Sequence, residues 1–130
     1  MMRRAIFLLL IGLAAGCTST PPPAKQAKST SVAPATLSDA DRAIVERDTL
    51  AALPDVSNAS FRTISASKGS SGTMTVCGYI NVVASSGTSS GDKPFIGVLS
   101  GGEFRLSAMG GSEEETIAVQ TECVQNRVYI

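Results

Sequence analysis

The run from Thr73 to Ala84 constrains the fold more than any other stretch of the chain. Its residues alternate, and β-branched side chains are frequent, which is typical of a strand. One face would carry Met74, Val76, Gly78, Ile80 and Val82, and the other Thr75, Cys77, Tyr79, Asn81 and Val83. Because both faces hold apolar residues, we expect a central strand that is covered on both sides.

The other segments predict an α+β domain with a small antiparallel sheet of about four strands. Ser38 and Asp41 favour a helix over residues 39–51. Its apolar stripe would hold Ala40, Ala43, Ile44, Arg47 and Ala51, with Val45 and Leu50 beside it. Alternation and turn residues predict further strands at 60–66, 95–99 and 104–109, the last two joined through a Gly101-Gly102 turn. Residues 112–123 fit either a helix or a strand, and the cap formed by Ser112 and Glu115 favours the helix.

The first residues have the three parts of an export signal. Met1 to Arg4 is positively charged, Ala5 to Ile11 is apolar, and Gly12 to Gly16 contains small residues. The apolar part is shorter than the roughly 20 residues that a membrane-spanning helix needs. We therefore expect residues 1–16 to be a signal peptide.

The residues Leu13-Ala14-Ala15-Gly16-Cys17 resemble the lipobox of bacterial lipoproteins. The resemblance implies that the Cys17 thiol carries diacylglycerol, that cleavage follows Gly16, and that the new amino group is acylated, for example with palmitate. Thr18 in the next position implies sorting to the outer membrane, facing the periplasm. The alternative is an ordinary signal peptide followed by an unmodified cysteine.

Residues 17–36 predict a disordered linker behind this cysteine. Pro21, Pro22, Pro23 and Pro34 are spread among Ala, Ser, Thr and Lys, with little that could be buried. We expect the folded domain to be a single unit covering residues 37–130.

The composition limits the possible functions. Cleavage would remove Arg3 and Arg4. The mature chain would then have 9 of the 11 basic residues and all 11 acidic residues, and its net charge would be −2. We therefore expect no nucleic-acid partner. The chain also contains no histidine, which is the most common acid–base residue and transition-metal ligand near neutral pH. We expect no cofactor and no metal site.

Two cysteines, Cys77 and Cys123, remain beside the lipidated one. The expected compartment is oxidising, and two thiols allow a single pairing. The spacing is not the C-x-x-C of redox proteins, so we favour a structural disulfide over a redox pair.

The domain also resembles a family of small uncharacterised bacterial lipoproteins and periplasmic proteins. The similar residues are Phe61-Arg62, Val76-Cys77-Gly78, Asn81, Gly91, Phe95 and Cys123. The resemblance implies a secreted α+β domain stapled by one disulfide, and it carries no established activity. In that family the loop before Gly91 usually holds aromatic and Asn residues, whereas the loop of residues 85–91 has neither.

The candidate sites are weak in sequence. Arg62, Tyr79 and Asn81 could form a polar surface that binds a peptide or glycan, although each also fits an ordinary cross-strand hydrogen bond. Residues 85–92 predict a flexible loop, and Glu113, Glu114 and Glu115 fit helix capping better than a catalytic cluster.

We therefore expect a lipid-anchored cell-envelope protein that acts by binding or as a structural accessory, with an envelope protein or glycan as its partner. One alternative is an inhibitor that inserts the loop of residues 85–92 into an envelope hydrolase. The other is an enzyme, a carboxylate-dependent hydrolase.

The lipobox leads to a direct prediction. The Cys17→Ser variant should lose its acyl chains, migrate differently from the wild-type protein and leave the membrane fraction, because anchoring depends on about 0.8 kcal/mol per buried methylene. Detergent phase partitioning and gel mobility measure both effects. Unchanged mobility and membrane retention would contradict the lipobox.

Overall fold

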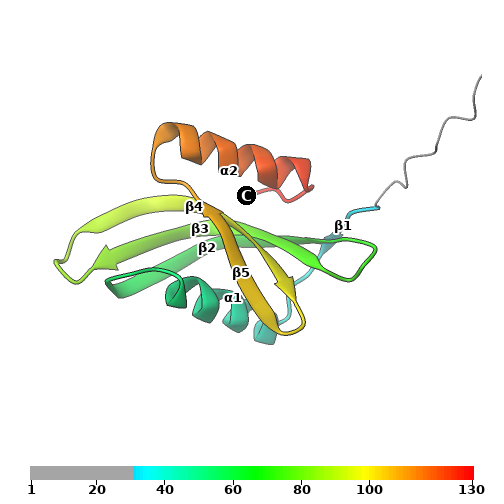
Figure 1. Cartoon of the computed structure of the whole chain (residues 1–130), viewed down its shortest axis with the longest axis horizontal. Coiled ribbons are helices and arrows are strands. Elements are labelled where there is room, and N and C mark those ends of the chain that lie inside the picture. The colour runs from blue at the N-terminus through cyan, green and yellow to red at the C-terminus, as the bar shows by residue number, and fades with distance from the viewer. Residues whose placement is uncertain (1–30) are drawn as a thin grey trace, which may run out of the picture.

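The computed structural model of the chain describes residues 31–130. The predicted signal peptide, Cys17 and most of the predicted linker lie outside the described residues. The structure contains a five-stranded antiparallel sheet and two helices (Figure 1), which confirms the α+β prediction. The strands occur in the sheet in chain order: β1 (Ala33–Ala35), β2 (Val56–Lys68), β3 (Met74–Ala84), β4 (Ser89–Ser100) and β5 (Glu103–Met109).

The two helices lie on opposite faces of this sheet. Figure 1 shows α1 (Asp39–Ala51) below the sheet and α2 (Glu113–Gln125) above it. Both helices begin with the expected capping box, Ser38 with Asp41 and Ser112 with Glu115. Residues 39–51 are helical as predicted, and the ambiguous C-terminal segment is a helix. Within residues 31–130, neither helix is long and apolar enough to cross a membrane.

Strand β3 occupies the centre of the sheet, and its two faces serve two separate cores. Val76 and Ile80 point into the core on the α1 side, together with the aromatic rings of Phe95 and Phe104. Cys77 points to the other side, where it packs in a smaller core beneath α2. The alternation of residues 73–84 therefore predicted the central, doubly covered strand correctly.

Glycines make room for the aromatic rings of the larger core. The Phe95 ring meets Phe61 and Phe104 edge to face, with centroid distances of 6.0 Å and 6.2 Å. A Cβ on Gly78 would lie 2.9 Å from the Phe95 ring, and one on Gly97 would lie 2.2 Å from the Phe104 ring. Both strand positions therefore require the absence of a side chain.

Helix α1 buries a different stripe from the one expected. Val45 and Thr49 are fully buried, whereas Ala40, Ala43, Arg47 and Ala51 are exposed. The Thr49 hydroxyl donates to the Val45 carbonyl at 2.6 Å, so this polar side chain is buried without an unsatisfied donor. The sequence analysis did not assign Thr49 to the buried stripe.

One carboxylate ties α1 to the far edge of the sheet. Asp48 accepts the backbone N–H of Phe104 at 2.9 Å, which joins the helix to β5. The Arg47 side chain, which donates to the same carboxylate, and the Phe104 N–H hold the pKa of Asp48 below its usual range.

The cysteine prediction is confirmed. Cys77 on β3 and Cys123 on α2 form a disulfide, and both residues are fully buried. The smaller core around it consists of Ile96, Val119 and Val128. The disulfide thus joins the second helix to the central strand.

The structure extends several of the predicted strands and adds one. The sheet has five strands, because Ala33–Ala35 of the predicted linker pair with Ala66–Lys68, so regular structure begins before residue 37. The strands predicted at 60–66 and 95–99 are longer, at 56–68 and 89–100. Serine-rich, weakly apolar ends concealed these extensions, because backbone pairing in a ladder does not require apolar side chains.

The loop predicted for residues 85–92 is a tight hairpin. The Ala84 N–H donates to Thr88, the Gly87 N–H donates to Ala84, and Gly87 takes φ +86°. This matches a three-residue turn with a left-handed glycine, after which β4 begins at Ser89. Half of the residues expected to be flexible, 89–92, therefore belong to a strand.

The glycine contacts generate a paired prediction. Gly97→Ala should destabilise the fold by about 2–3 kcal/mol, because the new Cβ overlaps the Phe104 ring and the Arg105 carbonyl. Gly69→Ala should change the stability by no more than about 0.5 kcal/mol, since its Cβ would lie 3.7 Å from the nearest atom. Urea unfolding compares the two variants, and equal midpoints would contradict the packing described.

Candidate functional site

The structure brings the three predicted surface residues together on one face. Arg62 on β2 pairs directly with Tyr79 on β3, and Asn81 follows two residues later on the same strand. Directly paired residues and residues two apart share a face of a sheet. Arg62, Tyr79 and Asn81 therefore lie on the face that carries Cys77 and α2.

Each of these side chains is held by a neighbour within the fold. The Arg62 guanidinium forms an ion pair with Asp92 on β4. The Tyr79 hydroxyl accepts from Gln120 of α2 at 2.9 Å, and the Asn81 amide oxygen accepts from Ser89 at 2.8 Å. The cross-strand and core-edge contacts that the sequence left open are therefore present. Since Arg62 is 68% exposed, its ion pair contributes little to stability.

Helix α2 covers only part of this face. The helix packs mainly on β4 and β5 and is bonded to β3 at Cys77, whereas Arg62 and Asn81 stay at least partly exposed. We call the uncovered part the polar face, and define it by Asn58, Ser60, Arg62, Tyr79, Asn81 and Ser89. A shallow hollow of about 170 Å³ lies within it, lined in part by Asn58, Ser60 and Asn81.

Exposed apolar side chains border the polar face. Ile117 and Val124 of α2 are 56% and 55% exposed. They lie three residues before and four residues after Gln120, which places all three on one stripe of the helix. Because Gln120 reaches Tyr79, this stripe runs along the margin of the polar face. The sequence analysis missed this margin, although the i, i+7 spacing of Ile117 and Val124 was a readable signal.

The acidic residues at the start of α2 have separate surroundings. Glu115 accepts the Ser112 N–H at 2.9 Å and serves as a cap. Glu113 and Glu114 line an open hollow with Ser112 and Ile117. Successive side chains diverge around a helix, so the two carboxylates do not face one point. Within residues 31–130, no cluster of three or more His, Cys, Asp or Glu side chains could hold a metal ion.

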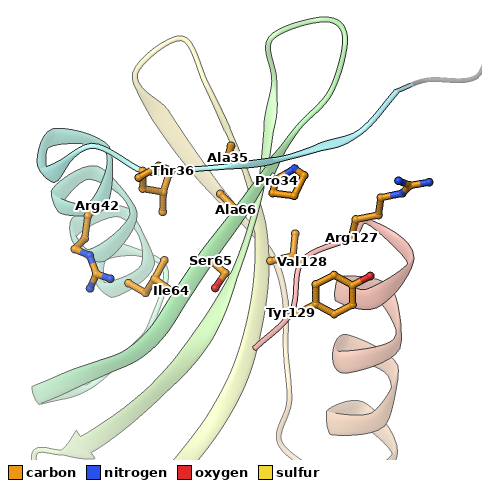
Figure 2. A pocket seen from close by; sticks show the side chains of 11 residues that line it. Pro34, Ala35, Thr36, Arg42, Ile64, Ser65, Ala66, Arg127, Val128 and Tyr129 are labelled. Carbon is orange, nitrogen blue, oxygen red and sulfur yellow. The ribbon is translucent and has the colours of Figure 1, made fainter.

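A third hollow, which the sequence did not predict, opens at the β1 edge of the sheet and has a volume of about 420 Å³. Figure 2 shows this groove between four segments of the chain. It is lined by residues 34–37, Arg42 of α1, residues 64–66 of β2 and residues 127–129 after α2. We call it the edge groove. No sequence pattern could reveal it, because its walls come from both ends of the domain.

Comparisons with known proteins add no relative: no family model, no curated protein and no solved structure matches the chain. The resemblance to small bacterial lipoproteins therefore stays a prediction. The structure nevertheless shows what several of the residues that carry this resemblance do in the fold. Phe61 and Gly78 accommodate the Phe95 ring, and Cys77 bonds to Cys123.

Proposed function

We propose that the protein is a lipid-anchored, non-catalytic binding module of the cell envelope, and that its polar face binds the partner. The observation that supports this most is the part of the sheet face that α2 leaves uncovered, bordered by exposed Ile117 and Val124. Binding surfaces commonly combine apolar contacts with a rim of hydrogen-bonding groups. The partner is an envelope protein or glycan.

The polar face is suited to binding because its side chains are already positioned. Asp92, Gln120 and Ser89 hold Arg62, Tyr79 and Asn81 in place. Less side-chain freedom is then lost when a partner binds, which improves affinity for a given contact area. The charge of Arg62 is balanced by Asp92, which favours a neutral, hydrogen-bonding partner surface over a strongly charged one.

The proposed anchor sets where this face can act. Diacylglycerol and an N-acyl chain on Cys17 would hold the protein on the outer membrane, facing the periplasm. The 15 residues from 18 to 32 precede β1 and could span up to about 45 Å as an extended, proline-rich chain. The domain could therefore meet partners well away from the membrane surface.

One observation favours the inhibitor as a second candidate function. The hairpin around Ser85, Ser86 and Gly87 is closed by two backbone hydrogen bonds and one between the hydroxyls of Ser86 and Thr88. A pre-shaped loop loses little freedom on entering an enzyme cleft. A hydrolase would instead need two carboxylates facing one substrate. Asp92 is paired with Arg62, and Glu115 caps α2, so these two carboxylates do not support a hydrolase.

In-cell photo-crosslinking tests the proposal. A photoreactive residue at Ser60 should give one dominant adduct of protein or glycan mass, because Ser60 is exposed within the polar face. The same residue at Ser107, an exposed serine of the edge strand β5, is the matched control and should give little. Mass spectrometry identifies the adducts.

The variant Arg62→Gln should reduce the Ser60 adduct several-fold, because it removes both the cation and its ion pair. A photoreactive residue at Ser86 separates the two candidate functions. A dominant adduct from Ser86 alone would replace the proposal by the inhibitor. Equal yields from Ser60, Ser86 and Ser107 would contradict binding through either surface.

A further inference from the structure

The edge groove has an apolar wall and a cationic rim. Pro34, Leu37 and Ile64 contribute accessible apolar surface, while Arg42 and Arg127 are the two cationic residues of the lining. Figure 2 shows Arg42 at the α1 end of the groove, and Arg127 and Tyr129 at the opposite end, beside α2. No Asp or Glu is among the residues that line it.

The two arginines keep their charge available to a ligand. The contact between Arg42 and Glu46 is long, at 3.9 Å, and both side chains are more than one-third exposed. Such pairs are worth little in water. Arg127 forms no salt bridge with any residue in the 31–130 range. An anion in the groove would therefore not have to displace a strong internal partner.

Two unusual backbone conformations occur at the groove. Arg127 has φ +58°, and Thr63, which precedes Ile64, has φ +49°. The left-handed region is unfavourable for residues other than glycine, and especially for a β-branched residue such as threonine. Thr63 lies in an irregularity where the register with β3 shifts between Arg62 and Ser65. Irregularities of this kind re-aim the following side chains, here Ile64 and Ser65, which line the groove.

The neighbouring strand leaves this part of β2 accessible. β1 pairs only with Ala66, Ser67 and Lys68, so within the described residues Ile64 and Ser65 have no strand beside them on that edge. Beyond β1 the chain turns towards α1, and Thr36 and Leu37 form the adjoining wall. A bulge at Thr63 could serve only to protect the sheet edge from pairing with another chain. That role would not require two arginines, and no Asp or Glu, among the residues that line the groove.

We propose that the edge groove binds an amphiphilic anion, in which a phosphate or carboxylate head is joined to an aliphatic chain. The chain lies against Pro34, Leu37 and Ile64, and the head pairs with the guanidinium of Arg42 or Arg127. The volume of about 420 Å³ is in the range of small-molecule sites and accommodates one short chain. The ligand comes either from the membrane, as an anionic phospholipid, or from solution.

Tyrosine fluorescence of the full-length protein in nanodiscs of neutral phospholipid tests this proposal. The chain has two tyrosines and no tryptophan, and Tyr129 lines the groove. Octyl phosphate, added below its micelle concentration, should change the emission in a saturable way. The response should disappear in Tyr129→Phe and weaken at least ten-fold in the double variant Arg42→Gln, Arg127→Gln. Arg105→Gln, a control outside the groove on β5, should respond like the wild-type protein.

Further measurements in the same assay identify the source of the ligand and test whether its charge is required. A membrane source predicts that nanodiscs of anionic phospholipid already give the changed emission and suppress the octyl phosphate response. A soluble source predicts an unchanged response in those nanodiscs. An equal response to uncharged octyl glucoside, or an undiminished response in the double arginine variant, would overturn the proposal. The result does not depend on the function proposed for the polar face.

Discussion

The disulfide between Cys77 and Cys123 is the contact on which the two-sided architecture depends. The hydrophobic cluster on the α1 side contains seven buried residues, including Phe95 and Phe104, whereas the cluster on the α2 side contains five and no aromatic ring. Burying an aliphatic side chain contributes about 1.5–3 kcal/mol, so the smaller core supplies little beyond the entropy cost of ordering α2. A disulfide closing a loop of this length, with a sequence separation of 46, adds roughly 3–4 kcal/mol. Covalent linkage therefore compensates for a core that is too small to hold a helix firmly.

This arrangement also determines which surface is open. The bond to Cys77 holds α2 on the face formed by β3, β4 and β5, and the part of β2 and β3 around Arg62 and Asn81 stays at least partly exposed. Gln120 then reaches Tyr79 from the helix, and the stripe of Ile117 and Val124 lies along the margin. A helix centred over the sheet would cover Tyr79 and Asn81 and leave no such face. The proposed binding role thus follows from where one buried sulfur lies in the central strand.

The sequence predicted the elements whose signals are local and strong. The capping boxes at Ser38 and Ser112, the Gly101-Gly102 turn and the alternation around Val76 are all short-range patterns, and each is present in the structure. It failed where long-range contacts decide the outcome. Ala33–Ala35 becomes a strand because β2 offers an edge for pairing, and Thr49 is buried because α1 packs on β5 and β2. The shared face of Arg62 and Tyr79 needed the register of β2 against β3, and the edge groove needed four segments brought together.

Hydrogen exchange of the oxidised and reduced protein tests most directly whether the disulfide holds α2 on the sheet. Reduction should speed exchange at the amides of residues 113–125 by more than a hundred-fold, because the loss of about 3–4 kcal/mol falls on the smaller core. Amides in α1 and in the central strands β3 and β4 should keep most of their protection, since the aromatic core remains intact. Unchanged exchange in residues 113–125, or equal loss of protection across the whole domain, would contradict this account.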